Sequence, residues 1–137
     1  MTEAEIVRVA LRFANEINRH DVDALLALAS DDHLFVDGLG QELHGRDKLR
    51  AAWHEYFELF PDYHIDVRET FQSGRVVALL GTASGTLTVE GQARSENRWK
   101  VPAAWRAVVD HGQVVHWQVY ADNEPARRIL AARAPPG

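Results

Sequence analysis

The sequence predicts an α+β domain in which three helices precede a strongly bent antiparallel sheet. Two observations lead to this prediction. Apolar residues recur at helical spacing up to about residue 60, and from Tyr63 onward they alternate with polar residues at a period of two. The 137 residues contain no repeat or low-complexity segment, so a single domain over residues 1–137 is expected, with the helices on one face of the sheet.

Composition excludes several classes of protein. The chain is 46% hydrophobic and 26% charged, which is ordinary for a globular protein, and its net charge of −5 argues against a nucleic-acid partner. The longest aliphatic run, Val76 to Leu80, is far shorter than the roughly 20 residues that span a bilayer, so no membrane partner is expected. The N-terminus lacks the basic and apolar regions of a secretory signal, which makes the cytoplasm the expected location.

The three helices have recognisable boundaries. The first begins with the capping-box spacing of Thr2 and Glu5 and runs to about Arg19. Asp21 can cap the second helix, which forms a hairpin with the first. The third lies between Gly45 and Pro61. Its inward residues are expected to be Leu49, Trp53, Tyr56, Phe57 and Phe60.

The strands follow from alternation and turn residues. A short strand is expected at Leu34–Asp37, before the third helix. The later strands are expected at 63–71, 75–89, 95–110 and 116–122, and a short terminal helix at 126–132. On the strand that begins at Tyr63, Ile65, Val67 and Phe71 are expected to share one face. Pro102 marks a bulge or an edge, because proline cannot donate to a central ladder.

The last strand ends in a carboxylate, Asp122. Trp117 and Val119 fall on one face of this strand, and Tyr120 and Asp122 fall on the other. A buried acid at a strand end is a candidate general acid or base, because one carboxyl can both take and give a proton. The alternative is that Asp122 is a turn former or a helix cap, since Asn and Pro follow it closely.

The pattern as a whole resembles the nuclear transport factor 2-like superfamily, over nearly the whole chain. The segments that carry the resemblance are Asp21–Leu28, Ser30–Gly40, Gly45–Leu49, Phe60–Asp62 and Asp110–Asp122. It points to the SnoaL-like and ketosteroid isomerase-like branch. The resemblance implies a cone-shaped cystatin-like roll, with a strongly curved mixed or antiparallel sheet packed on three N-terminal helices. It does not imply one reaction, because this fold hosts many reactions and some members catalyse none.

The ketosteroid isomerases point to Asp37 as a second candidate. Asp37 lies where the resemblance places their proton-shuttling carboxylate. Their oxyanion-binding tyrosine and aspartic acid fall on Phe13 and Ala104, neither of which can donate a hydrogen bond there. Steroid isomerisation by that mechanism is therefore not expected. The alternative for Asp37 is an acid that forms the turn at a strand end.

The chain also resembles two other branches of this superfamily in part. Limonene epoxide hydrolase matches at Trp117 and loosely at Arg98, but its catalytic aspartate falls on Val119. The SnoaL-like cyclases use a carboxylic acid late in the fold, without metal or cofactor, and Asp122 is the nearest match. Tyr120 lies on the same face of the strand as a possible hydrogen-bond partner.

The cone is expected to enclose a pocket for a small apolar or aromatic molecule. The substrate-binding candidates are Tyr120, Trp117, His33, His64, Trp53, Tyr56, Phe13, Arg98 and Trp105. The alternative for the aromatic residues is the core and a dimer interface. His33 and His64 are candidates for a couple with Asp37 or Asp122. No metal and no cofactor are expected, because no histidine pair has zinc-site spacing and the chain has no cysteine.

The hypothesis from the sequence is a small-molecule-binding protein that performs cofactor-free acid/base chemistry of the cyclase, isomerase, dehydratase or hydrolase type. The alternative is a non-catalytic ligand-binding or accessory dimerisation module of the same fold. Apolar residues on the sheet face away from the helices lead us to expect a homodimer through that face. Asp37 and Asp122 are both expected to project into one cavity, from opposite walls.

Overall fold

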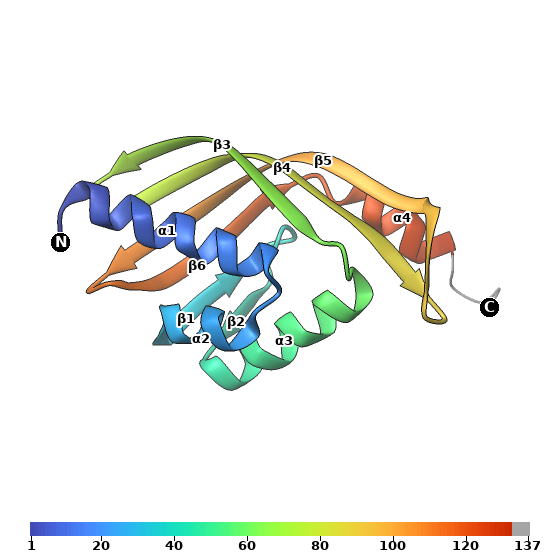
Figure 1. Ribbon diagram of the computed structural model, residues 1–137, viewed down its shortest axis with the longest axis horizontal. Helices are drawn as coiled ribbons and strands as arrows, with labels where there is room; N and C mark the ends of the chain where they lie inside the picture. Colours follow the sequence, from blue (N-terminus) through green and yellow to red (C-terminus); the bar gives the residue numbers. More distant parts are fainter. Residues whose placement is uncertain (133–137) are drawn as a thin grey trace.

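The computed structural model describes residues 1–132, which form four helices and one six-stranded sheet (Figure 1). The elements in chain order are α1 (Glu3–Asn18), α2 (Val22–Leu28), β1 (Ala29–Val36), β2 (Glu42–His44), α3 (Arg46–Leu59), β3 (His64–Ser73), β4 (Val76–Val89), β5 (Gln92–Asp110), β6 (Gln113–Ala121) and α4 (Glu124–Ala132). Among these residues no helix is long and apolar enough to cross a membrane. The α+β prediction is confirmed.

The predicted helix starts of α1 and α2 are confirmed atom by atom. The Glu5 amide donates to Thr2 Oγ1 at 3.2 Å, and the Thr2 amide donates to Glu5 Oε2 at 3.0 Å, which completes the capping box. The Ala24 amide donates to Asp21 Oδ1 at 3.0 Å at the start of α2. These bonds satisfy amides that have no partner within the helix, so the side chains fix where each helix begins.

The sheet has the strand order β2-β1-β6-β5-β4-β3 and is mixed. Every neighbouring pair is antiparallel except β1 and β6, which are parallel. The residue pattern alone predicted an antiparallel sheet and missed this pair, because β1 and β6 are separated by most of the chain. The parallel register places Phe35 of β1 opposite Trp117 of β6, which brings two aromatic side chains to the same wall.

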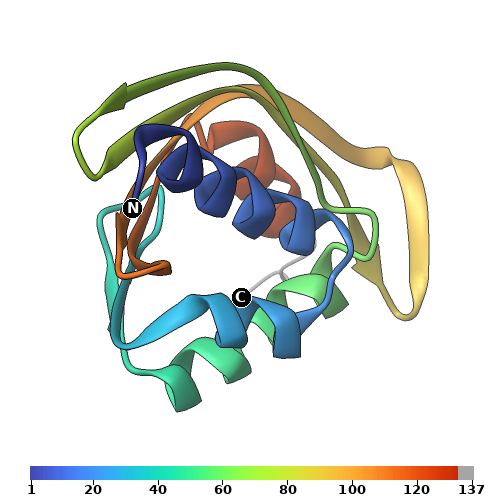
Figure 2. The same ribbon diagram turned by 60° about the vertical axis from the view of Figure 1, so that its left-hand side comes forward.

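The sheet arches around α1, as Figures 1 and 2 show, and α2 and α3 lie below α1 on the same concave side. The register shifts between Val67 and Glu69, between Thr86 and Thr88, and between Val108 and Val109, and such bulges bend a strand. Gly81 lies beside the first shift, where a Cβ would overlap the Asp66 carbonyl oxygen, so only glycine lets the two strands approach there.

The structure decides the strand predictions for Pro102 on β5 and Phe71 on β3. The β4–β5 register runs through Pro102 without a bulge, and the pairing of β5 with β6 begins at Ala103. Residues 92–102 of β5 therefore pair with β4 alone, Pro102 is the last of them, and the edge alternative is confirmed. Phe71 is 56% exposed, in contrast to buried Ile65, because the bulge in β3 moves it to the outer face of the sheet.

The core lies between α1 and the concave face of the sheet. Phe13 of α1 is fully buried against Trp117 of β6, with ring centroids 4.7 Å apart. Trp105 and Leu79 on β5 and β4 are also buried almost completely. The core fills one end of the arch, and the other end remains open between α3, the β1–β2 turn and α4.

Candidate functional site

A cavity of about 360 Å³ occupies the open end of the arch. Its volume lies within the range of small-molecule pockets. The described residues that line it are Phe35, Asp37, Gly38, Leu39, Leu43, Leu49, Ala52, Trp53, Tyr56, Phe60, Tyr63, Trp117, Val119, Asn123, Ala126, Arg127 and Leu130. Most of these residues are apolar, so burial of apolar surface is the interaction that the cavity offers most.

Six aromatic residues form the walls, and all of them except Trp117 are linked by contacts between their rings. The Trp117 ring packs on Phe13. Trp53 meets Phe35 edge-on, with centroids 5.6 Å apart. Tyr56 meets Tyr63 edge-on at 4.8 Å and lies 5.0 Å from Phe60. Edge-to-face contacts are favourable for aromatic rings, because the positive edge of one ring meets the negative face of the other. The walls are therefore held in place by the protein's own packing.

The two tyrosines bring phenols, not phenolates, to the cavity. Burial raises the pKa of Tyr56 well above its ordinary value, because the charged form would lose its hydration. Burial likewise raises the pKa of Tyr63 far above its ordinary value. Both rings remain neutral at any physiological pH, and each keeps a hydroxyl that can donate or accept a hydrogen bond.

Asp37 is the one carboxylate among the described lining residues. Its Oδ1 accepts hydrogen bonds from the Leu39 amide at 2.8 Å and from the Gln41 amide at 3.0 Å, across the turn between β1 and β2. The turn-forming alternative is therefore confirmed, and the same residue also faces the cavity. The two amides fix the position of the carboxylate at the mouth.

The start of α4 closes the mouth on the side opposite α3. A Cβ at Gly38 would overlap the side-chain amide of Asn123, so glycine at this position lets the start of α4 lie directly against the β1–β2 turn. Ala126, Arg127 and Leu130 then line the cavity from the following turns of the helix. The mouth is thus formed by two segments that are far apart in the sequence.

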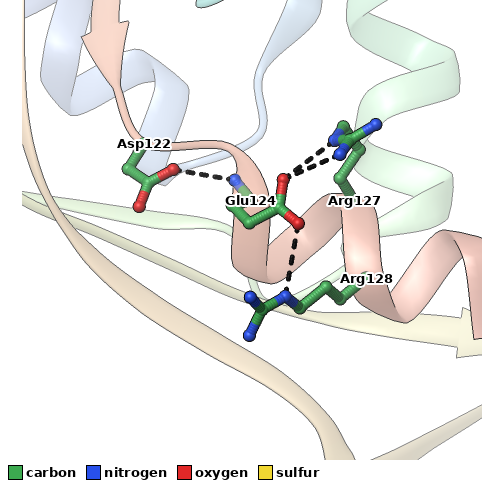
Figure 3. Close-up of polar contacts among 4 residues, drawn as sticks. All are labelled: Asp122, Glu124, Arg127 and Arg128. Carbon is green, nitrogen blue, oxygen red and sulfur yellow. Dashed lines mark hydrogen bonds and ion pairs between the residues drawn. The ribbon is translucent and has the colours of Figure 1, made fainter.

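Asp122 does not line the cavity, and its side chain is exposed. Its Oδ1 accepts a hydrogen bond from the Glu124 amide at 3.0 Å, at the start of α4 (Figure 3). The prediction that Asp37 and Asp122 project into one cavity is therefore wrong for Asp122. The reason is strand alternation: Trp117 and Val119 of β6 face inward, so Asp122 falls on the outward side with Tyr120.

A charged cluster follows on α4. Glu124 Oε2 accepts from Arg127 Nε at 3.0 Å and from Arg127 Nη2 at 2.9 Å, and Glu124 Oε1 accepts from Arg128 Nε at 3.2 Å (Figure 3). These bonds, those of Arg127 first, hold the pKa of Glu124 below its usual value. The guanidinium of Arg127 at the mouth is therefore already paired with a carboxylate.

The other sequence-predicted residues divide into three groups. Trp53, Tyr56 and Trp117 line the cavity. Phe13, Trp105 and His33 are buried in the core and do not line it. Tyr120, His64 and Arg98 are exposed and lie outside it. The second and third groups correct the sequence-based site, because composition identified aromatic and polar residues without showing which strand face each one occupies.

His33 has a structural position. Its Nδ1 lies 2.6 Å from the Val114 carbonyl oxygen and donates to it, which links β1 to β6, and its ring stacks on Phe13. Burial lowers the pKa of His33, so the ring is neutral. The expected couple with Asp37 or Asp122 is wrong for His33, because the one hydrogen bond that its side chain makes within residues 1–132 goes to the Val114 carbonyl.

The sequence reasoning missed the face of α4 that lines the cavity. Asn123, Ala126, Arg127 and Leu130 are spaced as one helical face, and this spacing was the available signal. Phe35 was also missed, although it precedes Asp37 by two residues on one strand and must share its face. Within residues 1–132 no three His, Asp or Glu side chains gather into a possible metal site.

Comparison with known proteins gives the family. The model of the SnoaL-like domain matches residues 10–117, which is most of the chain. The protein belongs to this family. A search of curated proteins finds no match.

Solved structures show the same fold at low sequence identity. A protein of Shewanella denitrificans, proposed to be a SnoaL-like polyketide cyclase, is 16% identical, with a TM-score of 0.80 over 96% of this chain and 100% of that one. A proposed polyketide cyclase of Xanthomonas campestris is 18% identical, with a TM-score of 0.80 over 92% and 97%. A ketosteroid isomerase-like protein of Catenulispora acidiphila, crystallised with trimethylamine, is 17% identical, with a TM-score of 0.71 over 82% and 83%. These likenesses support the fold and leave the ligand to be argued from the site.

Proposed function

We propose that this protein binds a small apolar, ring-bearing molecule in the cavity between α3, the β1–β2 turn and α4. The observation that carries the proposal is the cavity of about 360 Å³ with six aromatic side chains in its walls. A ring that enters it exchanges contact with water for contact with apolar walls, which contributes about 25 cal/mol for each Å² buried. The mutual packing of the rings also reduces the ordering cost of binding, because the walls exist before the ligand arrives.

The binding proposal is tested by filling the cavity from one residue. Ala52 lines the cavity from α3, and neighbouring Ala51 is exposed on the same helix. The probe is 1-N-phenylnaphthylamine, a neutral dye that becomes fluorescent in apolar surroundings. We expect Ala52→Leu to weaken dye binding at least tenfold and Ala51→Leu to leave it unchanged. Equal binding by the two variants would place the dye elsewhere and contradict the proposal.

We further propose that the protein performs cofactor-free acid/base chemistry on its ligand, with Asp37 as the group that transfers the proton. Asp37 supports this role because it is the one carboxylate among the described lining residues and because two backbone amides fix its orientation. Both hydrogen bonds that its side chain accepts within residues 1–132 go to Oδ1, which leaves Oδ2 for a proton of the ligand. The reaction would be of the cyclase, isomerase, dehydratase or hydrolase type. The competing function is binding without turnover.

We also propose that the protein forms a homodimer through the outer face of the sheet. Tyr120, Ala104, Leu80 and Glu69 lie in register across β6, β5, β4 and β3. Tyr120 is 51% exposed and Leu80 is 36% exposed, and Phe71 is exposed nearby on the same face. Groups of large exposed apolar side chains occur more often at interaction surfaces than on the rest of a protein surface. Light scattering at micromolar concentration should give twice the chain mass, and a monomer mass would contradict the proposal.

A further inference from the structure

The charge that faces the cavity is unevenly compensated. Among the described lining residues, Asp37 and Arg127 carry the formal charges. Arg127 is held by two hydrogen bonds to the Glu124 carboxylate. No lysine, arginine or histidine within residues 1–132 forms an ion pair with Asp37. Of the two charged lining residues, Asp37 is therefore the one without an ion-pair partner among residues 1–132.

Aromatic rings lie beside this carboxylate. Phe35 precedes Asp37 by two residues on one strand face, contacts Trp53 edge-on at 5.6 Å, and lies in register with Trp117 of β6. Aromatic faces attract cations because their π-systems are electron-rich, and the indole of tryptophan attracts them most strongly. A cation near Asp37 would meet both a full negative charge and this group of rings.

The same features disfavour an anion. An anionic ligand would face the like charge of Asp37 and would lose its hydration against apolar walls. Tyr56 and Tyr63 remain neutral phenols, so they add ring surface to the cavity without adding charge. Arg127 attracts an anion less than an unpaired guanidinium would, because the Glu124 carboxylate already offsets its charge.

We propose that the natural ligand of this cavity is an ammonium-bearing molecule. Its charged nitrogen lies at the mouth beside Asp37, and its apolar body extends toward Leu49, Phe60 and Tyr63, which are buried at the inner end. The inference rests on the proposed binding of a small molecule in this cavity. It does not depend on whether the bound molecule is then transformed.

The test uses three probes of nearly equal shape and different charge. Benzyltrimethylammonium is a permanent cation, neopentylbenzene is its neutral carbon isostere, and phenylmethanesulfonate is an anion of similar size. Binding is measured by quenching of tryptophan fluorescence, because Trp53 and Trp117 line the cavity. We expect the cation to bind about tenfold more tightly than the neutral isostere, and the anion to bind most weakly.

Variants at Asp37 and Arg127 show which charge causes any difference in affinity among the three probes. Asp37→Asn keeps an oxygen that can accept from the Leu39 and Gln41 amides, so the turn is retained while the charge is lost. This variant should bind benzyltrimethylammonium about tenfold more weakly than the wild type and should bind neopentylbenzene equally well. Arg127→Gln should leave the cation bound at least as tightly as before. Asp122→Asn removes a charge outside the cavity and is the matched control. It should leave the affinities for all three probes unchanged.

The outcomes separate this inference from the binding proposal. If the neutral isostere binds as tightly as the cation, the ammonium inference is overturned and cavity binding stands. If the sulfonate binds most tightly and Arg127→Gln abolishes that binding, the mouth selects anions and the inference is again overturned. If none of the three probes binds, both the inference and the binding proposal fall.

Discussion

Two aspartates end two neighbouring strands of this sheet, and their surroundings differ in one decisive respect. Asp37 follows β1 and Asp122 follows β6, and each uses Oδ1 to accept backbone amide hydrogens of the turn after its strand. Asp37 shares a strand face with Phe35 and lines the cavity. Asp122 shares a face with exposed Tyr120 and lies outside the cavity. Similar hydrogen bonds to turn amides thus accompany a cavity-lining carboxylate in one case and only the start of a helix in the other, because the two aspartates lie on different faces of the sheet.

The largest expected effect separates the two aspartates by turnover. On a substrate found by screening, Asp37→Asn should lower kcat by roughly 10²–10⁴-fold, because the variant keeps the shape and loses the titrating proton. Asp122→Asn should retain the wild-type rate. Measurement of kcat for both variants checks this. An unchanged kcat in both variants would contradict proton transfer by Asp37 and would favour the non-catalytic alternative.

A second prediction concerns the contact that joins the two regions. A methyl group at Gly38 would overlap the Asn123 side chain, so Gly38→Ala should lower the free energy of unfolding by about 1–3 kcal/mol. Most of the loss should disappear when Asn123→Ala is already present, because the overlapping amide is then gone. Urea unfolding of the wild type, the two single variants and the double variant measures the coupling. Additive losses would mean that Gly38 and Asn123 do not touch.

A third prediction uses His33, whose ring is hydrogen-bonded to the Val114 carbonyl and so links β1 to β6. Its pKa in the folded protein is below the unfolded value of about 6.5, so the unfolded chain binds the proton more readily. Protonation of His33 therefore does not lower the free energy of unfolding above about pH 6.5. As the pH falls from there through the folded pKa, the free energy of unfolding decreases, with a slope of at most about 1.4 kcal/mol per pH unit.

Two histidine variants check this prediction, and the second is the matched control for the first. His33→Gln should flatten the dependence of unfolding free energy on pH between about 7.5 and 5. His64→Gln, which changes an exposed side chain, should leave the slope as in the wild type. A wild-type slope in His33→Gln would show that His33 is not the group that takes up the proton.

The smallest expected effect is on the stability of the α4 start. Asparagine can accept the Glu124 amide hydrogen as aspartate does, so Asp122→Asn should change the free energy of unfolding by less than about 0.5 kcal/mol. Asp122→Ala should cost about 1 kcal/mol, because the amide then loses its side-chain partner. Thermal unfolding followed by circular dichroism compares the two. Equal losses in both variants would make the charge, and not the hydrogen bond, the stabilising feature.

Local chemistry made much of the fold predictable. The capping residues Thr2 and Asp21 each accept from an amide three residues away, so the sequence alone located the starts of α1 and α2. The turn between β1 and β2 was predictable for the same reason. The parallel pairing of β1 with β6 was not, because it depends on contacts between residues about eighty positions apart, as His33 and Val114 show.

The candidate site was predicted less completely than the fold. Trp53, Tyr56 and Trp117 were found because aromatic residues at core spacing are natural cavity walls. Asp122, Tyr120 and Arg98 were placed in the site by chemical type and resemblance, and their strand faces put them outside it. Asn123 and Arg127 were missed because their spacing marks one face of a helix but does not show that this face packs on the distant β1–β2 turn and reaches the cavity.

The most direct test of the account is to observe where a ligand binds. Backbone amide resonances of ¹⁵N-labelled protein would be followed while 1-N-phenylnaphthylamine is added. The account predicts the largest shifts at Leu39, Ala52 and Ala126, on the three segments around the cavity mouth, with little change at Leu80 and Tyr120 on the outer face of the sheet. Shifts concentrated at Leu80 and Tyr120, with Leu39, Ala52 and Ala126 unmoved, would contradict it.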